Sequence, residues 1–289
     1  MPISNLSHLV PEARKVAELD DASRISAIQR DRWVNYPRAT EALERLERLL
    51  QTPKRERMPC MVMHGDSNIG KTLIIAKFMR GHPPSFDASR GAEQRDVIAM
   101  QMPATPDQHR FYSALLYELN APFGARASVS ALERLARGLL KQLAPKMLVV
   151  DEVHHLLSGS YREQRASLNL LKYLANDLKI SVVLVGTSDA PVALQTDAQM
   201  SSRFPPFEIP RWRENDDFRR LLKAFECTLP LRKASDLGQR PIAHFMLSTS
   251  NGLTGEVSKL LREAASMAIR DCSEKITLSH LEQAAYAPA

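Results

Sequence analysis

The residues best suited to chemistry are eight consecutive ones that match G-x-x-x-x-G-K-[ST], the pattern of a phosphate-binding loop. They are Gly65, Asp66, Ser67, Asn68, Ile69, Gly70, Lys71 and Thr72. The two glycines let the backbone bend so that consecutive N–H groups point at one anion, and the N-terminus of a following helix adds positive charge. Lys71 should reach the β- and γ-phosphates of a nucleotide, and the Thr72 hydroxyl should ligate Mg²⁺.

The residues on either side of this loop supply the context that the motif requires. Residues 58–64 predict a short buried strand, and residues 73–79 have helical spacing without a breaker. The alternative, in which the glycines only mark a turn, is disfavoured by this order of strand, loop and helix.

A second element is a run of four apolar residues that ends in two carboxylates. Residues 146–152 read Lys-Met-Leu-Val-Val-Asp-Glu, which is typical of a buried parallel strand with acidic residues at its carboxyl end. Ligands bind at that edge of parallel sheets. Asp151 should hold the Mg²⁺ through water, and Glu152 should polarise the attacking water.

Two further features follow the acidic pair. His154 and His155 are adjacent, and because adjacent side chains of a helix point in different directions, we do not expect them to share a metal. A strand predicted over 180–186 ends at Thr187, within reach of the γ-phosphate or the attacking water. The alternative role of Thr187 is to cap a helix before Ala190 and Pro191.

Composition is that of an ordinary globular protein, with 44% hydrophobic and 25% charged residues. The 39 Lys and Arg residues exceed the 33 acidic ones, so the net charge is +6, which permits a nucleic-acid partner without requiring one. The three cysteines lie far apart, which disfavours disulfide and zinc frameworks. We find no span-length apolar run and no signal peptide, so we expect a cytoplasmic protein with no membrane partner.

The pattern of elements divides the chain into an N-terminal arm (1–32), an α/β domain (33–210) and a helical domain (211–289). The arm is polar, and could be flexible or could form helices that order on a partner. In the α/β domain, residues 82–94 look like a turn-rich connection. The other elements expected there are helices over 38–50, 107–119, 129–143, 161–178 and 197–204, and strands over 96–102 and 207–210. After residue 210 only helical patterns remain, over 214–225, 241–250, 256–269 and 278–286.

Two aromatic residues, Trp33 and Tyr36, precede the helix predicted over 38–50. In one interpretation they staple this helix to the core. In the other, one of them flanks the nucleotide base.

Together these motifs resemble an AAA+ ATPase, and within that class the TniB family of transposon target-site regulators, kin to TnsC and MuB. The resemblance covers about residues 33–286. It is carried by the stretches 36–39, 57–59, 65–72, 150–154, 185–187 and 202–204.

The resemblance implies a five-stranded parallel sheet of order 51432 with a C-terminal all-helical lid. It also implies ATP and Mg²⁺ as cofactors and a homo-oligomer, either a ring or a helical filament. The implied partners are duplex DNA bound without sequence preference, a DDE transposase and a further targeting protein. Carried over, Lys71, Thr72, Asp151, Glu152 and Thr187 form the site of one subunit.

Arg203 would be an arginine finger that enters the site of a neighbouring subunit. Its alternative role is that of a surface cap. The lid departs from the AAA+ pattern, because residues 251–256 carry no arginine at the sensor-two position. Lys259 or Arg262 could serve instead; otherwise lid closure responds less to the γ-phosphate.

For DNA contacts the candidates flank the second and third strands: Gln108, His109, Arg110, Arg162 and Arg165. For each of them, the interpretation as an ordinary solvated residue is the favoured one. An assembly repeats each charge many times, so modest patches add up to affinity for phosphates.

The leading interpretation is an ATP-dependent, DNA-binding regulator of transposition. A helicase loader or replication initiator is the alternative with the same fold; an initiator is expected to add a winged-helix module after the lid, which the few residues after 286 disfavour. A non-hydrolysing nucleotide-gated scaffold is the third, and Glu152 argues against it.

Overall fold

The computed structural model describes residues 6–89, 91–105, 107–195 and 198–286. It divides into two compact units. The sheet unit comprises Glu41–Ser67 and Lys71–Ile209, and the helical unit comprises Met1–Thr40, Asn68–Gly70 and Pro210–Ala289.

The centre of the sheet unit is a parallel five-stranded sheet with the order β4-β5-β6-β1-β7. Its strands are β1 (Met61–His64), β4 (Val97–Gln101), β5 (Met147–Asp151), β6 (Ser181–Gly186) and β7 (Pro206–Glu208). Counted along the chain as strands one to five of this sheet, the order is 51432, which confirms the expected topology. Every residue of β5 and β6 is buried, as parallel strands covered on both faces require.

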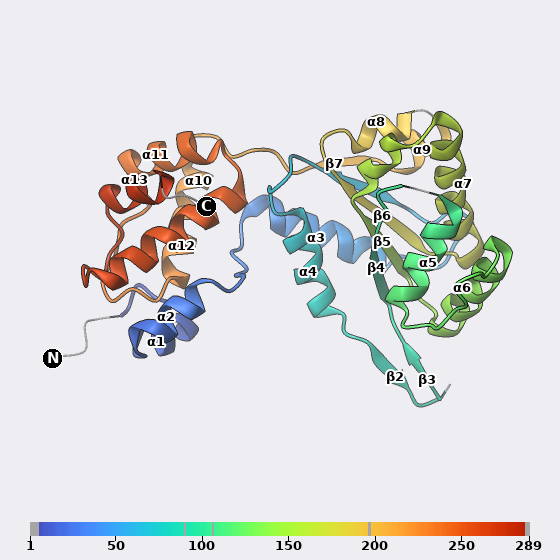
Figure 1. Cartoon of the computed structure of the whole chain (residues 1–289), viewed down its shortest axis with the longest axis horizontal. Coiled ribbons are helices and arrows are strands. Elements are labelled where there is room, and N and C mark those ends of the chain that lie inside the picture. The colour runs from blue at the N-terminus through green and yellow to red at the C-terminus, as the bar shows by residue number, and fades with distance from the viewer. Residues whose placement is uncertain (1–5, 90, 106, 196–197, 287–289) are drawn as a thin grey trace. The chain divides into compact units, whose positions relative to one another are not determined.

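Helices cover both faces of this sheet: α5, α6 and α7 lie on one side in Figure 1, and α3 and α4 on the other. The helices of the unit are α3 (Pro37–Leu50), α4 (Lys71–Gly81), α5 (Gln108–Glu118), α6 (Val129–Leu143), α7 (Tyr161–Leu178), α8 (Ala190–Gln195) and α9 (Ala198–Arg203), with the 3₁₀ helix η1 (Val153–Ser158). The expected bounds of α6 and α7 match to the residue.

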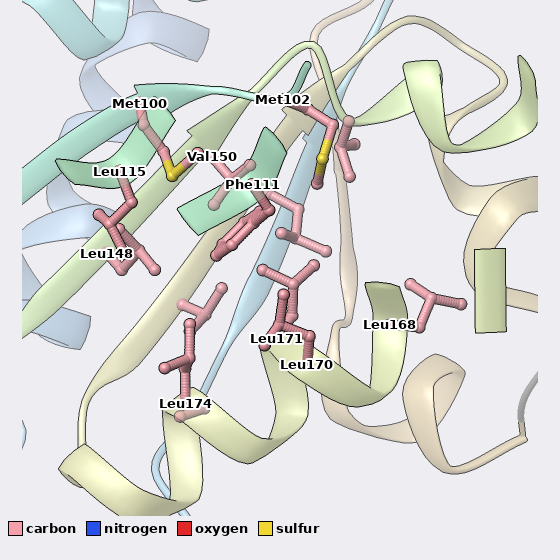
Figure 2. Close-up of a cluster of buried hydrophobic side chains, with 14 of the residues drawn as sticks. Met100, Met102, Phe111, Leu115, Leu148, Val150, Leu168, Leu170, Leu171 and Leu174 are labelled. Atoms are coloured by element: carbon pink, nitrogen blue, oxygen red, sulfur yellow. The ribbon is translucent and has the colours of Figure 1, made fainter. Parts of the chain in front are cut away.

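The core beneath α5 and α7 is built from aliphatic, aromatic and sulfur-containing side chains (Figure 2). Val150 of β5, Phe111 of α5, and Leu171 of α7 are each at most 1% exposed. Burying side chains of this size stabilises the fold by about 1.5–3 kcal/mol each. This core fixes the strand ends that carry the polar residues.

One connection differs from expectation. Within residues 82–94, predicted to be turn-rich, β2 (Ser85–Asp87) and β3 (Ala92–Gln94) form an antiparallel hairpin. Strands of three residues are too short to leave an alternating pattern, and Phe86 in β2 is 70% exposed. The hairpin therefore gave no hydrophobic signal.

The helical unit contains α1 (Pro11–Ala17), α2 (Asp21–Ile28), α10 (Asp216–Thr228), α11 (Arg240–Ser250), α12 (Thr254–Arg270) and α13 (Leu278–Tyr286). Helix α12 contacts α2, α11 and α13, and nine of its residues are buried. No helix within the described ranges is long and apolar enough to cross a membrane.

The first 32 residues, which the sequence left open between arm and helices, contribute α1 and α2 to this unit. Arg24 of α2 is 0% exposed and donates to both carboxylate oxygens of Glu274 and to Pro230 O. Arg232 also donates to Glu274, at 3.4 Å. All three nitrogens of the buried Arg24 guanidinium donate hydrogen bonds, and these bonds anchor α2 against residues near the end of the chain.

Tyr36 belongs to the same unit and packs edge-on against Trp212, with ring centroids 5.1 Å apart. The Trp212 Nε1–H donates to Thr254 Oγ1 at 3.0 Å. The Tyr36 ring is thus part of the packing of the helical unit, and both interpretations of Trp33 and Tyr36 stay predictions.

We expect Arg24→Met to be much less stable than the wild type, because the Glu274 carboxylate then loses its main partner in a buried setting. We expect the free energy of unfolding of the helical unit to fall by about 3 kcal/mol. The matched control is Arg220→Met, since Arg220 pairs with Asp217 on an exposed surface, where an ion pair contributes at most about 1 kcal/mol. Thermal unfolding followed by circular dichroism measures both. Equal unfolding temperatures for the two variants would contradict the assignment.

Candidate nucleotide site

The register of the sheet brings three strand ends to one edge. His64 of β1 pairs with Gly186 of β6, and Val150 of β5 pairs with Leu184 of β6. The residues that follow these strands therefore emerge side by side at the carboxyl edge, where α/β sheets bind ligands.

The loop after β1 has the backbone of a phosphate cradle. Gly65 has φ +156° and Gly70 has φ +103°, conformations that side chains with a Cβ rarely adopt. Between them Asn68 is left-handed, with φ +64°. The chain enters α4 at Lys71, so the first N–H groups of that helix face the loop.

Lys71 is only 9% exposed, and its Nζ donates to Gly65 O and Asp66 O, each at 2.8 Å. Burial lowers the pKa of the ammonium group, and the carboxylates of Asp151, Glu152 and Asp66 oppose that shift. An ammonium has three donors, and these two bonds use two of them. The third is available to an anion in the loop.

Thr72 and Asp151 place two oxygens where a magnesium ion is expected. The Thr72 hydroxyl donates to Asp151 Oδ2 at 3.1 Å, and Asp151 Oδ1 accepts from Glu152 N at 2.8 Å. Neighbouring oxygens around Mg²⁺, with bonds of about 2.1 Å, lie about 3 Å apart. The donor set therefore fits the metal that the sequence implied.

Glu152 follows Asp151 in a left-handed conformation, with φ +56°. Such a conformation costs a non-glycine residue about 1 kcal/mol or more and is concentrated at functional sites. Its side chain is 40% exposed, and Oε2 lies 3.1 Å from His154 Nδ1.

Thr187 follows β6, and its Oγ1 is buried without a hydrogen-bond partner. The first N–H of α8 instead bonds the backbone, with Ala190 N donating to Thr187 O at 3.0 Å. The hydroxyl is thus not engaged as a helix cap. A buried hydroxyl without a partner costs free energy, which a phosphate oxygen or a water would recover.

Ser188 is a site residue that sequence reasoning missed. Its hydroxyl donates to Asp66 Oδ1 at 3.0 Å and so ties the end of β6 to the phosphate loop. The signal was present in the adjacent hydroxyl residues Thr187 and Ser188, but only the first was chosen.

Arg203 lies at the end of α9 and is only 6% exposed. Its Nη1 donates to Asn176 Oδ1 of α7 at 2.8 Å, while Nε and Nη2 are buried without a hydrogen-bond partner. In the single chain this side chain is neither a surface cap nor an extended finger.

The candidate DNA-contacting residues lie at the starts of two helices. Gln108, His109 and Arg110 are exposed at the start of α5, and Arg162 and Arg165 are exposed at the start of α7. Because α5 follows β4 and α7 follows β5, both helix starts lie beyond the carboxyl edge of neighbouring strands. Arg110 pairs with Asp107, and His109 Nε2 lies 3.2 Å from Ala127 O.

The two histidines after the acidic pair do not diverge as expected. In η1 the rings of His154 and His155 lie with centroids 4.8 Å apart. Together with Glu152 they form a group of three possible ligands, whose donor atoms lie within 4.8 Å of one another. The two Nδ1 atoms have different partners, since that of His154 lies 3.1 Å from Glu152 Oε2 and that of His155 lies 3.0 Å from Met102 O.

The sequence of this chain matches one known protein family. The family described as Bacterial TniB protein matches residues 24–214, about two thirds of the chain. The chain belongs to the TniB family. No curated protein matches it at a significant level.

Solved structures similar to this TniB-family chain are AAA+ ATPases, which confirms the AAA+ P-loop fold. Cdc6p from Pyrobaculum aerophilum has a TM-score of 0.65 at 16% identity, covering 92% of this chain and 70% of that one. The Aeropyrum pernix ORC1 protein in complex with DNA has a TM-score of 0.61 at 16% identity, covering 90% and 68%. A Thermotoga maritima RuvB mutant has a TM-score of 0.52 at 15% identity, covering 87% and 69%.

For a TniB-family chain with this site, Glu152→Gln should keep nucleotide binding and lose turnover by about 100-fold or more, because an amide cannot accept the proton of water. Lys71→Ala should lose nucleotide binding itself. A fluorescent ATP analogue measures binding, and phosphate release measures turnover. Wild-type turnover in Glu152→Gln would remove this residue from the mechanism.

Proposed function

We propose that this chain is an ATP-dependent, DNA-binding regulator of transposition. It assembles on duplex DNA without sequence preference, and it recruits or activates a DDE transposase. The observation that carries the proposal is the edge where Lys71, Thr72, Asp151 and Thr187 meet in a TniB-family chain.

The chemistry follows from the groups at that edge. Lys71 and the loop N–H groups bind the phosphates of ATP, and Thr72 and Asp151 hold Mg²⁺, directly and through water. The metal, when bound, neutralises charge on the phosphates. Glu152 orients and deprotonates the attacking water, and Thr187 donates its hydroxyl to the γ-phosphate or to that water.

Hydrolysis is completed between subunits. The Arg203 guanidinium has two buried donors without partners, so its position against Asn176 is costly. On assembly Arg203 leaves Asn176 and reaches the phosphates bound by a neighbouring subunit, where a planar fork of donors stabilises the charge. Turnover is therefore slow in single chains and faster in the assembly.

DNA lies across the starts of α5 and α7, where Arg110, Arg162 and Arg165 are exposed. The net charge of +6 is modest, so affinity depends on repeating these residues along a homo-oligomer. The ORC1 structure of similar fold was solved with DNA, which is consistent with this role.

A helicase loader or replication initiator is the second candidate, favoured by the likeness to Cdc6p and ORC1. At 16% identity that likeness concerns the fold, whereas the TniB match concerns the family. Transposition is therefore preferred.

The proposed DNA track predicts that affinity for duplex DNA depends on ATP and falls steeply with salt, because each neutralised phosphate releases condensed counterions. Replacing Arg162 and Arg165 with alanine should weaken binding and reduce the slope of log affinity against log salt by about two units per subunit. Filter-binding titrations over a salt series measure both quantities, with unrelated duplexes expected to bind equally.

The matched control is the double variant Arg220→Ala with Arg240→Ala, which removes the same charge from exposed positions of the helical unit. It should bind DNA like the wild type. Affinity that ignores ATP or salt, or equal losses in the two double variants, would contradict the track.

The proposed role of Arg203 predicts complementation between inactive chains. Arg203→Ala lacks the finger and Lys71→Ala lacks the nucleotide, so mixing them should restore turnover at interfaces that pair an intact site with an intact finger. Phosphate release across mixing ratios measures this. If no ratio exceeds the sum of the separate activities, Arg203 does not act between subunits.

A further inference from the structure

His154 is placed to control Glu152, although the proposed reaction assigns it no role. Its Nδ1 lies 3.1 Å from Glu152 Oε2. This nitrogen is shielded from solvent and makes no aligned hydrogen bond. A shielded ring nitrogen without an aligned partner is unfavourable, so a small movement that aligns it with the carboxylate is stabilising.

His155 anchors the short helix that carries His154. Its Nδ1 lies 3.0 Å from Met102 O, and because a carbonyl only accepts, this nitrogen carries the proton. The His155 ring lies against that of His154, with centroids 4.8 Å apart and planes tilted by 54°. The ring of His154 is thus braced from the side of β4.

The helix η1 is also fastened to the segment that leads from β4 to α5. The Ser158 hydroxyl lies 2.8 Å from Ala104 O and 2.7 Å from His155 O and shares its one proton between them, and Met102 N donates to Asp151 O at 2.8 Å. Together with the bond from His155, three hydrogen bonds join residues 102–104 to β5 and η1. The segment is thus fastened both to η1 and to Asp151, the residue before Glu152, so a displacement of the segment reaches the pair of His154 and Glu152.

We propose that His154 is the positioning residue of Glu152, and that η1 couples its alignment to phosphate groups bound at the start of α5. The proposal deepens the function proposed above and rests on it. Backbone phosphates of duplex DNA contact residues 108–110, the segment 102–104 shifts, and His154 Nδ1–H aligns with Glu152 Oε2. The other carboxylate oxygen is then held toward the attacking water.

The hydrogen bond from His154 orients the Glu152 carboxylate. A glutamate side chain that is 40% exposed samples several rotamers, and a base contributes only when it is within hydrogen-bond reach of the proton that it accepts. One N–H bond to a single carboxylate oxygen fixes the rotamer and leaves the second oxygen free. The coupling makes turnover depend on DNA with no contact between DNA and nucleotide.

The test is steady-state ATP hydrolysis with and without duplex DNA in the wild type, His154→Ala and His154→Asn. The amide nitrogen of asparagine occupies nearly the position of Nδ1, so His154→Asn is the conservative variant. The matched control is His82→Ala, because His82 forms a similar pair with Glu47, at 3.2 Å and with comparable exposure, beyond the end of α4 that is opposite Lys71 and Thr72.

We expect duplex DNA to stimulate the wild type, His154→Asn and His82→Ala alike. In His154→Ala, kcat with DNA should fall about tenfold, the value of one hydrogen bond to a charged group, and the ratio of kcat with DNA to kcat without it should approach one. KM for ATP, affinity for duplex DNA and the unfolding temperature should stay close to those of His82→Ala, because His154 touches neither ligand.

Stimulation of His154→Ala equal to that of His82→Ala would overturn the inference and leave the proposed function standing. Loss of stimulation in both His154→Ala and His154→Asn would also overturn it, because it would assign the effect to packing of the ring. A wild type that binds ATP but whose turnover ignores duplex DNA would contradict the proposed function itself, and with it this coupling.

Discussion

The hydrogen bond from Thr72 Oγ1 to Asp151 Oδ2 is the contact on which the site depends. It joins the first turn of α4 to the end of β5, two segments that the sheet brings together only because β6 pairs with both β1 and β5. The parallel register puts Gly65, Asp151 and Thr187 at one edge, and the hydrophobic core under α5 and α7 holds that register. A one-residue slip would turn the side chains of the strand to the other face.

Several residues near this bond have conformations or surroundings that cost free energy. Lys71 is nearly buried, Glu152 has a left-handed backbone, and Thr187 keeps a buried hydroxyl without a partner. Each cost is relieved by a phosphate, a water or a change of position. Accumulated in one region, they are characteristic of a site built for a ligand rather than for maximum stability.

The features that local sequence patterns encode could be predicted from the sequence. The phosphate loop, the strand ending in Asp151 and Glu152, and the helices over 129–143 and 161–178 were all visible, because each is specified by neighbouring residues. Contacts between residues that are far apart in the sequence could not be predicted from it. Arg24 and Glu274 are 250 positions apart, and the burial of Arg203 depends on Asn176 of another helix. The approach of His154 to Glu152 depends on a left-handed residue followed by a 3₁₀ helix, whereas helical periodicity suggested divergence.

The central claim is that nucleotide bound at this edge drives assembly on DNA. Electron microscopy of the chain with duplex DNA, Mg²⁺ and a slowly hydrolysed ATP analogue tests it most directly. The account predicts rings or helical filaments around the duplex only when nucleotide is present, with triphosphate density between residues 65–72 and Asp151. Single chains under every condition, or nucleotide bound elsewhere, would contradict it.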